Sequence, residues 1–446
     1  MKKVLTLFLT FILILQAVFT VPVQSAAYDI PSNMDWWADS HFGMFIHLGA
    51  YSYYGQGEWA MSEQNISKKE YQENIASKFN PESFDAKTIV DYACKAGMKY
   101  IVITAKHHEG LAMWDTQVES FKDYTGTKLF SLQQYTPFGR TGRDILMELK
   151  EACDAAGIKF GLYYSIIDWN HPSQETGTSF TTMASMEARA NYIKDMKAQL
   201  NELVRRYNPS VMWFDGDWTY NNKEATLESW WTEQDGKDLY NYMKELKPDI
   251  IVNERVCRGY GLGDFECSEQ RVLIKAPSRL WETCQTMNYA WGYKESCEKT
   301  YREIKYILRE FVTAVSRGGN YLLNIGPKGD GTMTGGSKKI LNNIGKWMDI
   351  YSDSIYGTVK SPFGKEPGWG VYTQKDKNVY AHVFKWPKNR QLKIKCYKNK
   401  KPSGVRLNNS SGKKLKFSIK NNNIIVKLPE KAPDKRDTVI VTEYKN

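Results

Sequence analysis

The chain has 446 residues and a formal net charge of +11, and this length allows one large domain with a smaller one beside it. The charge is uneven, because residues 357–446 hold 22 Lys and Arg against 6 Asp and Glu, a net charge near +16, while the remaining chain is near −5. Basicity confined to one end, without patterned aromatic residues, excludes a nucleic-acid binder built over the whole chain. A solvated lysine-rich face is the favoured explanation, and weak attraction to an anionic cell surface or polymer is the alternative.

The first residues have the pattern of a signal peptide. Two lysines at positions 2 and 3 precede an apolar run that ends near Val21, and small residues follow at positions 25–27. This pattern predicts a signal peptide over residues 1–26 and a secreted protein. An uncleaved membrane anchor is the alternative, but Pro22 and the small residues argue against it, and no other stretch is apolar enough to span a bilayer.

Strand-like apolar runs then alternate with helix-like segments. The predicted strands span residues 42–48, 100–105, 159–166, 211–214, 250–253, 280–287 and 321–325. The predicted helices span residues 85–96, 144–156, 184–207, 237–246, 298–316 and 337–351. Such alternation predicts a parallel sheet with helical crossovers, and seven strands in roughly 320 residues fit a (β/α) TIM-like barrel better than an open sheet. The glycine-rich residues 259–263 do not open a helix, so we interpret them as a loop and not as a dinucleotide site.

The pattern changes after about Tyr356. Short, often alternating runs over residues 368–373, 378–384, 391–396, 415–419, 423–428 and 438–442 are separated by Gly, Pro, Asn and Lys. They predict an all-β sandwich with a structural role or a weak contact to carbohydrate. We therefore expect a signal peptide over residues 1–26, a catalytic barrel over residues 27–356 and a C-terminal sandwich over residues 357–446.

The stretch VMWFDGDW points to a catalytic carboxylate. Its apolar half ends at Asp215, and barrel enzymes place their catalytic groups at the C-terminal ends of strands. The alternative is an aspartate that caps a strand before a loop. Glycoside hydrolysis needs two carboxylates, and composition and spacing leave the pair open. The acidic candidates near strand ends are Glu58, Asp168, Asp215, Asp217, Glu254, Glu266, Glu269 and Glu282.

Three histidines also fall at predicted strand ends. His47 closes GMFIH, and His107 and His108 close IVITAKHH. Adjacent histidines point to opposite sides of a strand, and His171 is the only later candidate ligand in the barrel, so a metal site is disfavoured. We expect hydrogen bonds to the hydroxyl groups of a substrate, with satisfied core histidines as the alternative, and no metal or cofactor. The 14 Trp and 28 Tyr suit sugar binding, although they also serve as core residues.

Nine separated motifs occur in a fixed order between Trp36 and Gly331. They read WWADSHFGMFIHLGAYS, GEWAM, KHHEGLAMWDT, GLYYSIIDW, VMWFDGDW, VNERV, GDFECSEQ, WETCQTMNYAWGY and GGNYLLNIGPKGDG. Together they resemble the α-L-fucosidases of glycoside hydrolase family 29. The resemblance implies a barrel followed by a β-sandwich. It also implies retaining exo-hydrolysis of terminal α-L-fucose from oligosaccharides or glycoconjugates through a covalent fucosyl-enzyme.

The resemblance also assigns residues. The family's nucleophile maps onto Asp215. The positions that hold the sugar hydroxyls or further parts of the pocket map onto His47, Glu58, Trp59, His107, His108, Tyr164 and Arg255. The apolar pocket for the methyl group of fucose maps onto Phe45, Trp213 and Trp291. The acid/base varies in position within the family: Glu269 matches best, then Glu282, then Glu266. Glu282 lies in an apolar strand-like run, where it would instead orient a neighbour.

Two other classes of protein remain as alternatives. A non-catalytic fucose lectin would lose Asp215 or every loop carboxylate, and this sequence keeps them. A metal-dependent barrel hydrolase would need the histidine ligands that are disfavoured above. The seven cysteines show no CxxC spacing. One disulfide is possible among those at positions 257, 267, 284 and 297.

Overall fold

The computed structural model describes residues 31–176, 181–218, 223–409 and 411–445. The predicted signal peptide over residues 1–26 lies outside this part of the chain. None of the helices in the described part combines the length and the apolar character needed to cross a membrane.

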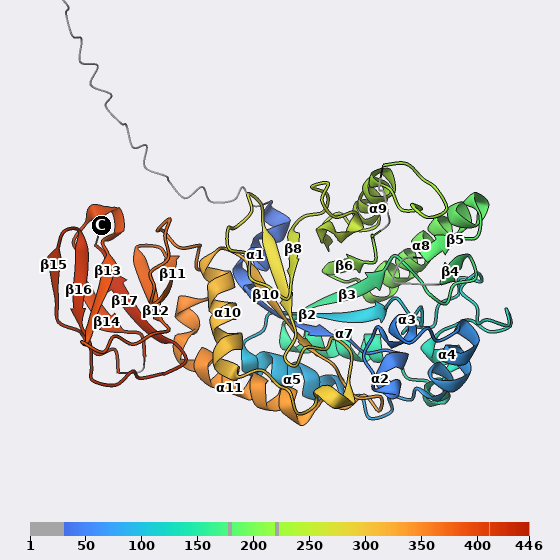
Figure 1. Cartoon of the computed structure of the whole chain (residues 1–446), viewed down its shortest axis with the longest axis horizontal. Helices are drawn as coiled ribbons and strands as arrows, with labels where there is room; N and C mark the ends of the chain where they lie inside the picture. Colours follow the sequence, from blue (N-terminus) through green and yellow to red (C-terminus); the bar gives the residue numbers. More distant parts are fainter. Residues whose placement is uncertain (1–30, 177–180, 219–222, 410, 446) are drawn as a thin grey trace, which may run out of the picture.

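The N-terminal part is built on eight parallel strands (Figure 1). Their order in the sheet is β7-β6-β3-β2-β1-β10-β9-β8. The strands are β1 (Phe42–Ile46), β2 (Tyr100–Lys106), β3 (Lys159–Ser165), β6 (Val211–Asp215), β7 (Ile251–Val252), β8 (Glu266–Glu269), β9 (Trp281–Gln285) and β10 (Asn320–Ile325). Every residue of β1, β2, β6, β9 and β10 is buried, as expected for parallel strands that are covered on both faces.

The two outer strands of this sheet meet and close it. Asn253, which follows β7, forms a parallel bridge with Phe265, which precedes β8. The N–H of Glu254 donates to the carbonyl oxygen of Phe265 at 2.9 Å. The N–H of Asp264 donates to the carbonyl oxygen of Val252 at 2.7 Å. The predicted (β/α) barrel is therefore confirmed. Strand β8 was not predicted from the sequence, because its polar residues ECSE do not form an apolar run.

Helices surround the barrel. The longer ones are α5 (Ala86–Ala96), α7 (Ile145–Ala156), α8 (Met186–Tyr207), α9 (Glu233–Leu246), α10 (Ile304–Ser316) and α11 (Gly335–Tyr351). The shorter ones are α1 (Asp35–Ser40), α2 (Ala50–Tyr54), α3 (Ala60–Glu63), α4 (Lys68–Asn74) and α6 (Leu132–Tyr135), and a hairpin of β4 (Gln174–Thr176) and β5 (Thr181–Met183) precedes α8. Several begin at a side chain that caps their free N–H groups; Thr232 and Asp235 form a capping box at α9.

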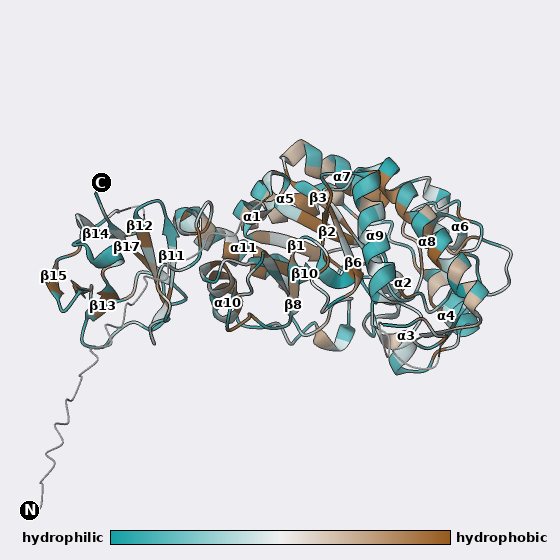
Figure 2. Cartoon of the chain, turned by 90° about the horizontal axis from the view of Figure 1, so that it is seen from above, coloured by the Kyte–Doolittle hydropathy of each residue, from teal (hydrophilic) through white to brown (hydrophobic). Residues whose placement is uncertain are grey.

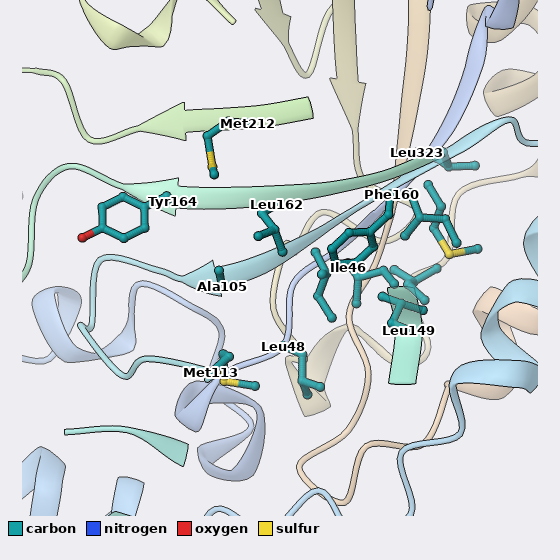
Figure 3. Close-up of a cluster of buried hydrophobic side chains, with 14 of the residues drawn as sticks. Ile46, Leu48, Ala105, Met113, Leu149, Phe160, Leu162, Tyr164, Met212 and Leu323 are labelled. Carbon is teal, nitrogen blue, oxygen red and sulfur yellow. The ribbon is translucent and has the colours of Figure 1, made fainter. Parts of the chain in front are cut away.

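Two apolar cores hold the barrel together. Phe45, Tyr163 and Trp213 belong to a core inside the ring of strands. A larger core lies between strands and helices, where Figure 3 shows Ile46, Leu162 and other side chains packed together. In Figure 2 the strands are mainly brown while the outer helix faces are mainly teal. Because neighbouring residues of a strand face opposite cores, the register of each strand decides which side chains can reach a site in the ring.

The C-terminal part is a sandwich of two antiparallel sheets. One has the order β11-β12-β17-β14, with β11 (Gly370–Lys375), β12 (Asn378–Val383), β17 (Thr438–Glu443) and β14 (Gly404–Leu407). The other has the order β13-β16-β15, with β13 (Gln391–Lys395), β16 (Asn423–Lys427) and β15 (Phe417–Lys420). Buried side chains of both sheets form one core, so the predicted all-β sandwich is confirmed, although β14 was not predicted. The division into domains at residue 356 stays a prediction.

The four-stranded sheet packs against the barrel. Its residues Val371 and Val439 belong to the larger barrel core. Arg309 of α10 donates to the carbonyl oxygens of Phe384 at 2.6 Å and Arg436 at 2.8 Å. The order of layers is therefore barrel, four-stranded sheet, three-stranded sheet, in agreement with Figure 1.

Candidate active site

A cavity of about 340 Å³ opens at the C-terminal ends of the barrel strands. Its lining comprises Phe45, His47, Trp59, His107, His108, Tyr163, Trp213, Asp215, Trp218, Arg255, Glu269, Cys284 and Trp291. Ten of these residues were predicted site residues. Three other predicted residues, Glu58, Tyr164 and Glu282, do not line the cavity. The position agrees with the rule that barrel enzymes carry their sites at this end of the strands.

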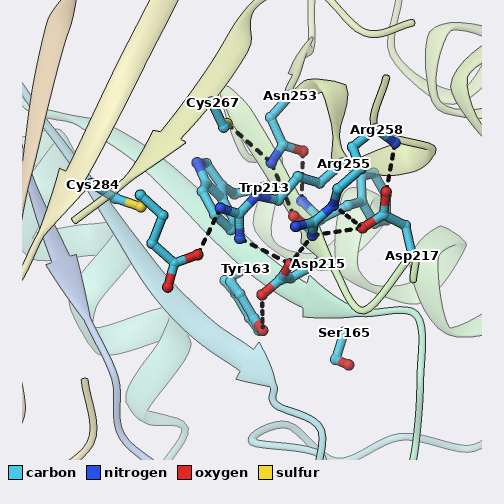
Figure 4. A network of polar contacts seen from close by, with 12 residues as sticks. Tyr163, Ser165, Trp213, Asp215, Asp217, Asn253, Arg255, Arg258, Cys267 and Cys284 are labelled. Atoms are coloured by element: carbon cyan, nitrogen blue, oxygen red, sulfur yellow. Dashed lines mark hydrogen bonds and ion pairs between the residues drawn. The ribbon is translucent and has the colours of Figure 1, made fainter. Parts of the chain in front are cut away.

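Asp215, the last residue of β6, has two differently placed carboxylate oxygens (Figure 4). Oδ1 accepts from Arg255 Nη1 at 2.9 Å and from Arg258 Nη2 at 2.8 Å. Oδ2 accepts from the Tyr163 hydroxyl at 3.4 Å and lies 3.9 Å from His108 Nε2. Burial alone would raise the pKa of Asp215, but the two arginine charges outweigh it and lower the pKa to about 2. The carboxylate is therefore ionised at neutral pH, with one oxygen fixed and the other turned away from the arginines.

Glu269, the last residue of β8, is the second carboxylate of the cavity. Its Oε2 accepts from Arg255 Nη2 at 2.8 Å, and its side chain is 41% exposed. One guanidinium, which lies over the Trp213 ring at 4.8 Å, thus contacts both Asp215 and Glu269. This shared contact holds the two carboxylates close together, which suits the separation of about 5–5.5 Å in retaining glycosidases.

The other two acid/base candidates lie elsewhere. Glu282 of β9 is 1% exposed and accepts from Trp213 Nε1 at 3.0 Å and from the Tyr100 hydroxyl. Burial raises its pKa to about 7. Glu266 is three residues before Glu269 on the same strand and so faces the opposite side. Neither Glu282 nor Glu266 lines the cavity, and Glu282 holds the Trp213 ring through its hydrogen bond, while the choice of the acid/base stays a prediction.

His47 follows β1 and is held by Asn324. The Asn324 amide nitrogen donates to the Trp291 carbonyl oxygen at 2.7 Å, so the amide oxygen is the atom 2.7 Å from His47 Nδ1. A carbonyl oxygen only accepts, and His47 Nδ1 is therefore the donor, which leaves Nε2 as an acceptor. Burial lowers the pKa of His47 to about 4 and keeps the ring neutral.

His108 has the same arrangement with a different partner. The Ser165 hydroxyl donates to the Ile167 carbonyl oxygen at 2.6 Å, so it accepts from His108 Nδ1 at 2.7 Å. His108 Nε2 is then an acceptor beside Asp215 Oδ2, and burial lowers the pKa of His108 to about 3. Two neutral histidines with free acceptor nitrogens are suited to bind hydroxyl groups that donate, as those of a sugar do.

His107 lines the cavity together with His108. The two adjacent side chains share the site because β2 ends at Lys106, so the alternation of the strand no longer applies to them. The His107 ring stacks on Tyr163 with centroids 5.3 Å apart. Burial lowers the pKa of His107 well below its ordinary value.

Aromatic rings form the rest of the wall. Phe45 lies 5.0 Å from Trp213 and 6.0 Å from Trp291, measured between ring centroids. Trp59 and Trp218 stack with centroids 6.0 Å apart and an angle of 20°. The first group offers an apolar corner beside the polar residues, and the second offers flat faces of the kind that pack on sugar rings.

The prediction for Tyr164 was wrong by one residue. Tyr163 belongs to the core inside the ring, whereas Tyr164 faces the helices and donates to Gln199 Oε1 of α8 at 2.7 Å (Figure 3). Glu58 is only 8% exposed, and its Oε2 accepts from the N–H of Gly292 at 2.8 Å. A contact between Glu58 and a sugar hydroxyl stays a prediction.

Sequence reasoning missed four residues of the site: Tyr163, Trp218, Arg258 and Cys284. Tyr163 and Trp218 lie within motifs quoted for the family, but nothing in the motifs says which way they face. Arg258 follows a short helical turn, where no periodicity applies; Asp217 binds it through Oδ1 at 2.8 Å and so holds it against Asp215. This gives Asp217 a local structural role.

The described residues contain no group of three His, Cys, Asp or Glu side chains that could hold a metal ion. All seven cysteines are described and free, so the disulfide considered among positions 257, 267, 284 and 297 does not form.

Comparison with protein families gives two matches. A family model described as alpha-L-fucosidase matches residues 16–353, and one described as the alpha-L-fucosidase C-terminal domain matches residues 367–442. The alpha-L-fucosidase of Dictyostelium discoideum is 30% identical over 385 residues, which cover 79% of this chain and 78% of that protein. Human tissue alpha-L-fucosidase is 30% identical over 387 residues, which cover 80% of this chain and 77% of that protein.

Solved structures agree over nearly the whole chain. Alpha-L-fucosidase isoenzyme 1 from Paenibacillus thiaminolyticus matches with a TM-score of 0.80 and 30% identity, covering 93% of this chain and 99% of that one. A glycoside hydrolase family 29 alpha-L-fucosidase from Bacteroides thetaiotaomicron, solved as a trapped covalent intermediate with 2-fluoro-fucosyl fluoride, matches with a TM-score of 0.81 and 27% identity, covering 94% and 98%.

Proposed function

The chain belongs to the α-L-fucosidases of glycoside hydrolase family 29, and we propose that Asp215 is the nucleophile and Glu269 the acid/base of its retaining mechanism. It is a glycoside hydrolase whose substrates are fucosylated glycans. The observation that carries the residue assignment is the contact of one guanidinium, that of Arg255, with both carboxylates at the mouth of the barrel.

In the first step Asp215 Oδ2 attacks the anomeric carbon of the α-L-fucosyl unit. The bond from that carbon to the leaving oxygen breaks, and Glu269 transfers its proton to that oxygen. The two arginines on Oδ1 keep the nucleophile ionised and fix its orientation, so the reacting oxygen is Oδ2. The product is a fucosyl ester of Asp215 and a free alcohol.

In the second step Glu269 takes a proton from water, which attacks the anomeric carbon and releases Asp215. Two inversions give net retention. Formation of the ester removes the negative charge of Asp215, so Glu269 is then the only carboxylate of the pair that interacts with the charge of Arg255. This favours the carboxylate form of Glu269, which is the form that the base of this step must have.

The remaining residues of the cavity suit fucose. His47 and His108 offer acceptor nitrogens to the ring hydroxyls, with His107 beside them. We propose that Phe45, Trp213 and Trp291 contact the methyl group that fucose carries in place of a hydroxymethyl group. An apolar corner of this kind disfavours a hydroxyl by on the order of a hundredfold.

Azide rescue of alanine variants tests the two carboxylates. With nitrophenyl α-L-fucoside, Asp215→Ala is expected to lose at least about a thousandfold in rate, and azide to yield a β-fucosyl azide. Glu269→Ala is expected to be rescued by azide with retained configuration. Glu266→Ala, on the opposite face of the same strand, is the matched control and keeps normal rates. Normal hydrolysis by Glu269→Ala, or rescue of Glu266→Ala, would show that the acid/base is another residue.

We also propose that the protein is secreted. The basic start, apolar run and small residues over positions 1–26 support a signal peptide and secretion, with the mature chain divided into residues 27–356 and 357–446. The net charge near +16 of the second part supports a weak association with an anionic cell surface. Sequencing the N-terminus of the protein recovered from culture medium tests the first point; an intact residue 1 on a cell-bound product would contradict it.

A further inference from the structure

The outer face of the three-stranded sheet is a regular array of lysines. Leu392, Ile394, Ile424 and Val426 point inward and are buried in the core of the sandwich. The alternate residues therefore point outward. We call these outward positions the lysine face: Gln391, Lys393, Lys395, Lys416, Ser418, Lys420, Asn423, Ile425 and Lys427.

The lysine face looks away from the catalytic part of the molecule. The four-stranded sheet separates it from the barrel, and in Figures 1 and 2 strands β13 and β15 lie at the far end of the chain's long axis. All five lysines are exposed. A ligand on this face would therefore not touch the cavity that holds Asp215.

Among the residues that the structure describes, no acidic side chain forms an ion pair with the lysine face. The strands β13, β15 and β16 contain no Asp or Glu, and none of the five lysines forms an ion pair within the described residues. Four of the six acidic residues after position 356 pair elsewhere, namely Glu366, Asp434, Asp437 and Glu443. The other two, Asp376 and Glu430, lie in loops.

Two of these lysines are even placed directly opposite each other. The N–H of Lys427 donates to the carbonyl oxygen of Lys416 at 2.8 Å, which continues the β15–β16 ladder by one pair. Like charges in that position repel across the roughly 5 Å between strands, so the arrangement destabilises the isolated sheet. An anion that binds both ammonium groups would remove this repulsion.

A hollow of about 580 Å³ lies at this end of the lysine face. Its lining is Asn389, Arg390, Gln391, Lys416, Phe417, Ser418, Ile425 and Lys427. Arg390 has a φ of 59°, unusual for a residue other than glycine, and its carbonyl oxygen accepts from the N–H of Leu428 at 2.8 Å. The hollow thus combines three cations, amide and hydroxyl groups between them, and an apolar floor.

We propose that the lysine face and this hollow bind a polysaccharide that carries sulfate or carboxylate groups. Cations separated by hydroxyl and amide groups match a chain in which anionic groups alternate with hydroxyl groups. A lipid surface would call for protruding large apolar side chains, and Ile425, the one large apolar side chain among the outward positions, is only partly exposed. The proposal makes the surface association proposed above specific, and it does not depend on the chemistry of Asp215.

Retention of the purified protein, with its barrel and sandwich together, on immobilised dextran sulfate tests the proposal, with uncharged dextran as the matched polymer. We expect retention by dextran sulfate and by polygalacturonate, none by dextran, and progressive loss as salt is added. The relative strength on the sulfated and the carboxylated polymer tells which anionic group is preferred.

A pair of triple variants locates the site. Lys393→Gln, Lys416→Gln and Lys427→Gln together are expected to weaken binding by on the order of tenfold or more, because several cooperating ion contacts are lost. Lys377→Gln, Lys398→Gln and Lys400→Gln remove the same charge from a separate hollow and serve as the control. Both variants are expected to hydrolyse nitrophenyl α-L-fucoside at the normal rate, so failure of the catalytic proposal would be seen separately.

Three results would overturn the proposal. They are absence of retention on both anionic polymers, equal losses in the two triple variants, and stronger binding to duplex DNA or to anionic phospholipid vesicles than to either polysaccharide. Equal losses would mean that net charge alone attracts the polymer. Thermal unfolding of each variant checks that the exchanged lysines, all of which are exposed, leave the sandwich folded.

Discussion

Replacing Glu282 with Gln separates a residue that orients Trp213 from one that transfers protons. The side chain is buried beneath the tryptophan, and burial raises its pKa from 4.5 to about 7. Gln has nearly the same shape and can still accept from Trp213 Nε1, so the contact at 3.0 Å is expected to survive. The change therefore removes the ionisable group with little change in packing.

The raised pKa has a consequence for stability with a definite sign. Between pH 4.5 and about 7 the folded protein keeps a proton on Glu282 that the unfolded chain releases, so stability falls as the pH rises through this window. A shift of this size corresponds to about 3 kcal/mol above pH 7. Glu282→Gln lacks this dependence. The difference in free energy of unfolding between Glu282→Gln and the parent protein is therefore expected to shift by about 3 kcal/mol in favour of the variant between pH 4.5 and pH 8.

Urea unfolding followed by tryptophan fluorescence at several pH values measures this difference, since all other titrating groups are shared by the two proteins. Hydrolysis of nitrophenyl α-L-fucoside is measured beside it and is expected to change less than about threefold, against the 10²–10⁴-fold loss typical of a missing acid/base. A stability difference that does not vary with pH would refute the burial argument. A large loss of activity that azide restores would refute the role given to Glu282.

Four further substitutions test the geometry of the site. Tyr163→Phe removes the hydroxyl at 3.4 Å from the nucleophile and is expected to lower kcat severalfold, whereas Tyr164→Phe costs about 1 kcal/mol of stability and leaves kcat unchanged; reversed effects would mean that the strand register is wrong. Lys106→Met leaves buried Asp168 without its partner at 3.0 Å, and thermal unfolding should show a loss of about 3–5 kcal/mol. Asp217→Asn loosens the second arginine on the nucleophile, so the acid limb of the pH profile of kcat/KM should move up by as much as about one unit; an unchanged limb would contradict this electrostatic role.

The strands of the barrel could be predicted where they are buried on both faces. Continuous apolar runs such as residues 211–214 are visible without any structure, and Asp215, the proposed nucleophile, stands where this run ends. Burial on both faces also leaves the register of a strand undetermined by its sequence. In a strand whose two faces are both buried, apolar residues do not tell which face lines the cavity, and Tyr164 was therefore chosen in place of Tyr163.

The least predictable part was the seam between β7 and β8. β7 has only two residues, although a strand was predicted over residues 250–253, and β8 is polar and gives no strand pattern. Glu269 is the last residue of β8, a strand that was not predicted. The contact of Arg255 with both carboxylates is set by side-chain packing over Trp213 and has no signature in the spacing of the motifs.

The closure of the barrel bears on how the two proposed catalytic groups are kept in place. The other seven junctions of the described ring are held by ladders of two or more residue pairs, whereas β7 and β8 are joined by the single bridge between Asn253 and Phe265. Asp215, the proposed nucleophile, lies on one side of this thin junction and Glu269 on the other. Beside the few backbone hydrogen bonds of this junction, the ion pairs of Arg255 with Asp215 and with Glu269 link its two sides. An insertion or deletion in the segment between these strands can reposition or replace the proton donor while the rest of the ring keeps its register, so a fold of this kind can exchange one half of its catalytic pair and retain the other.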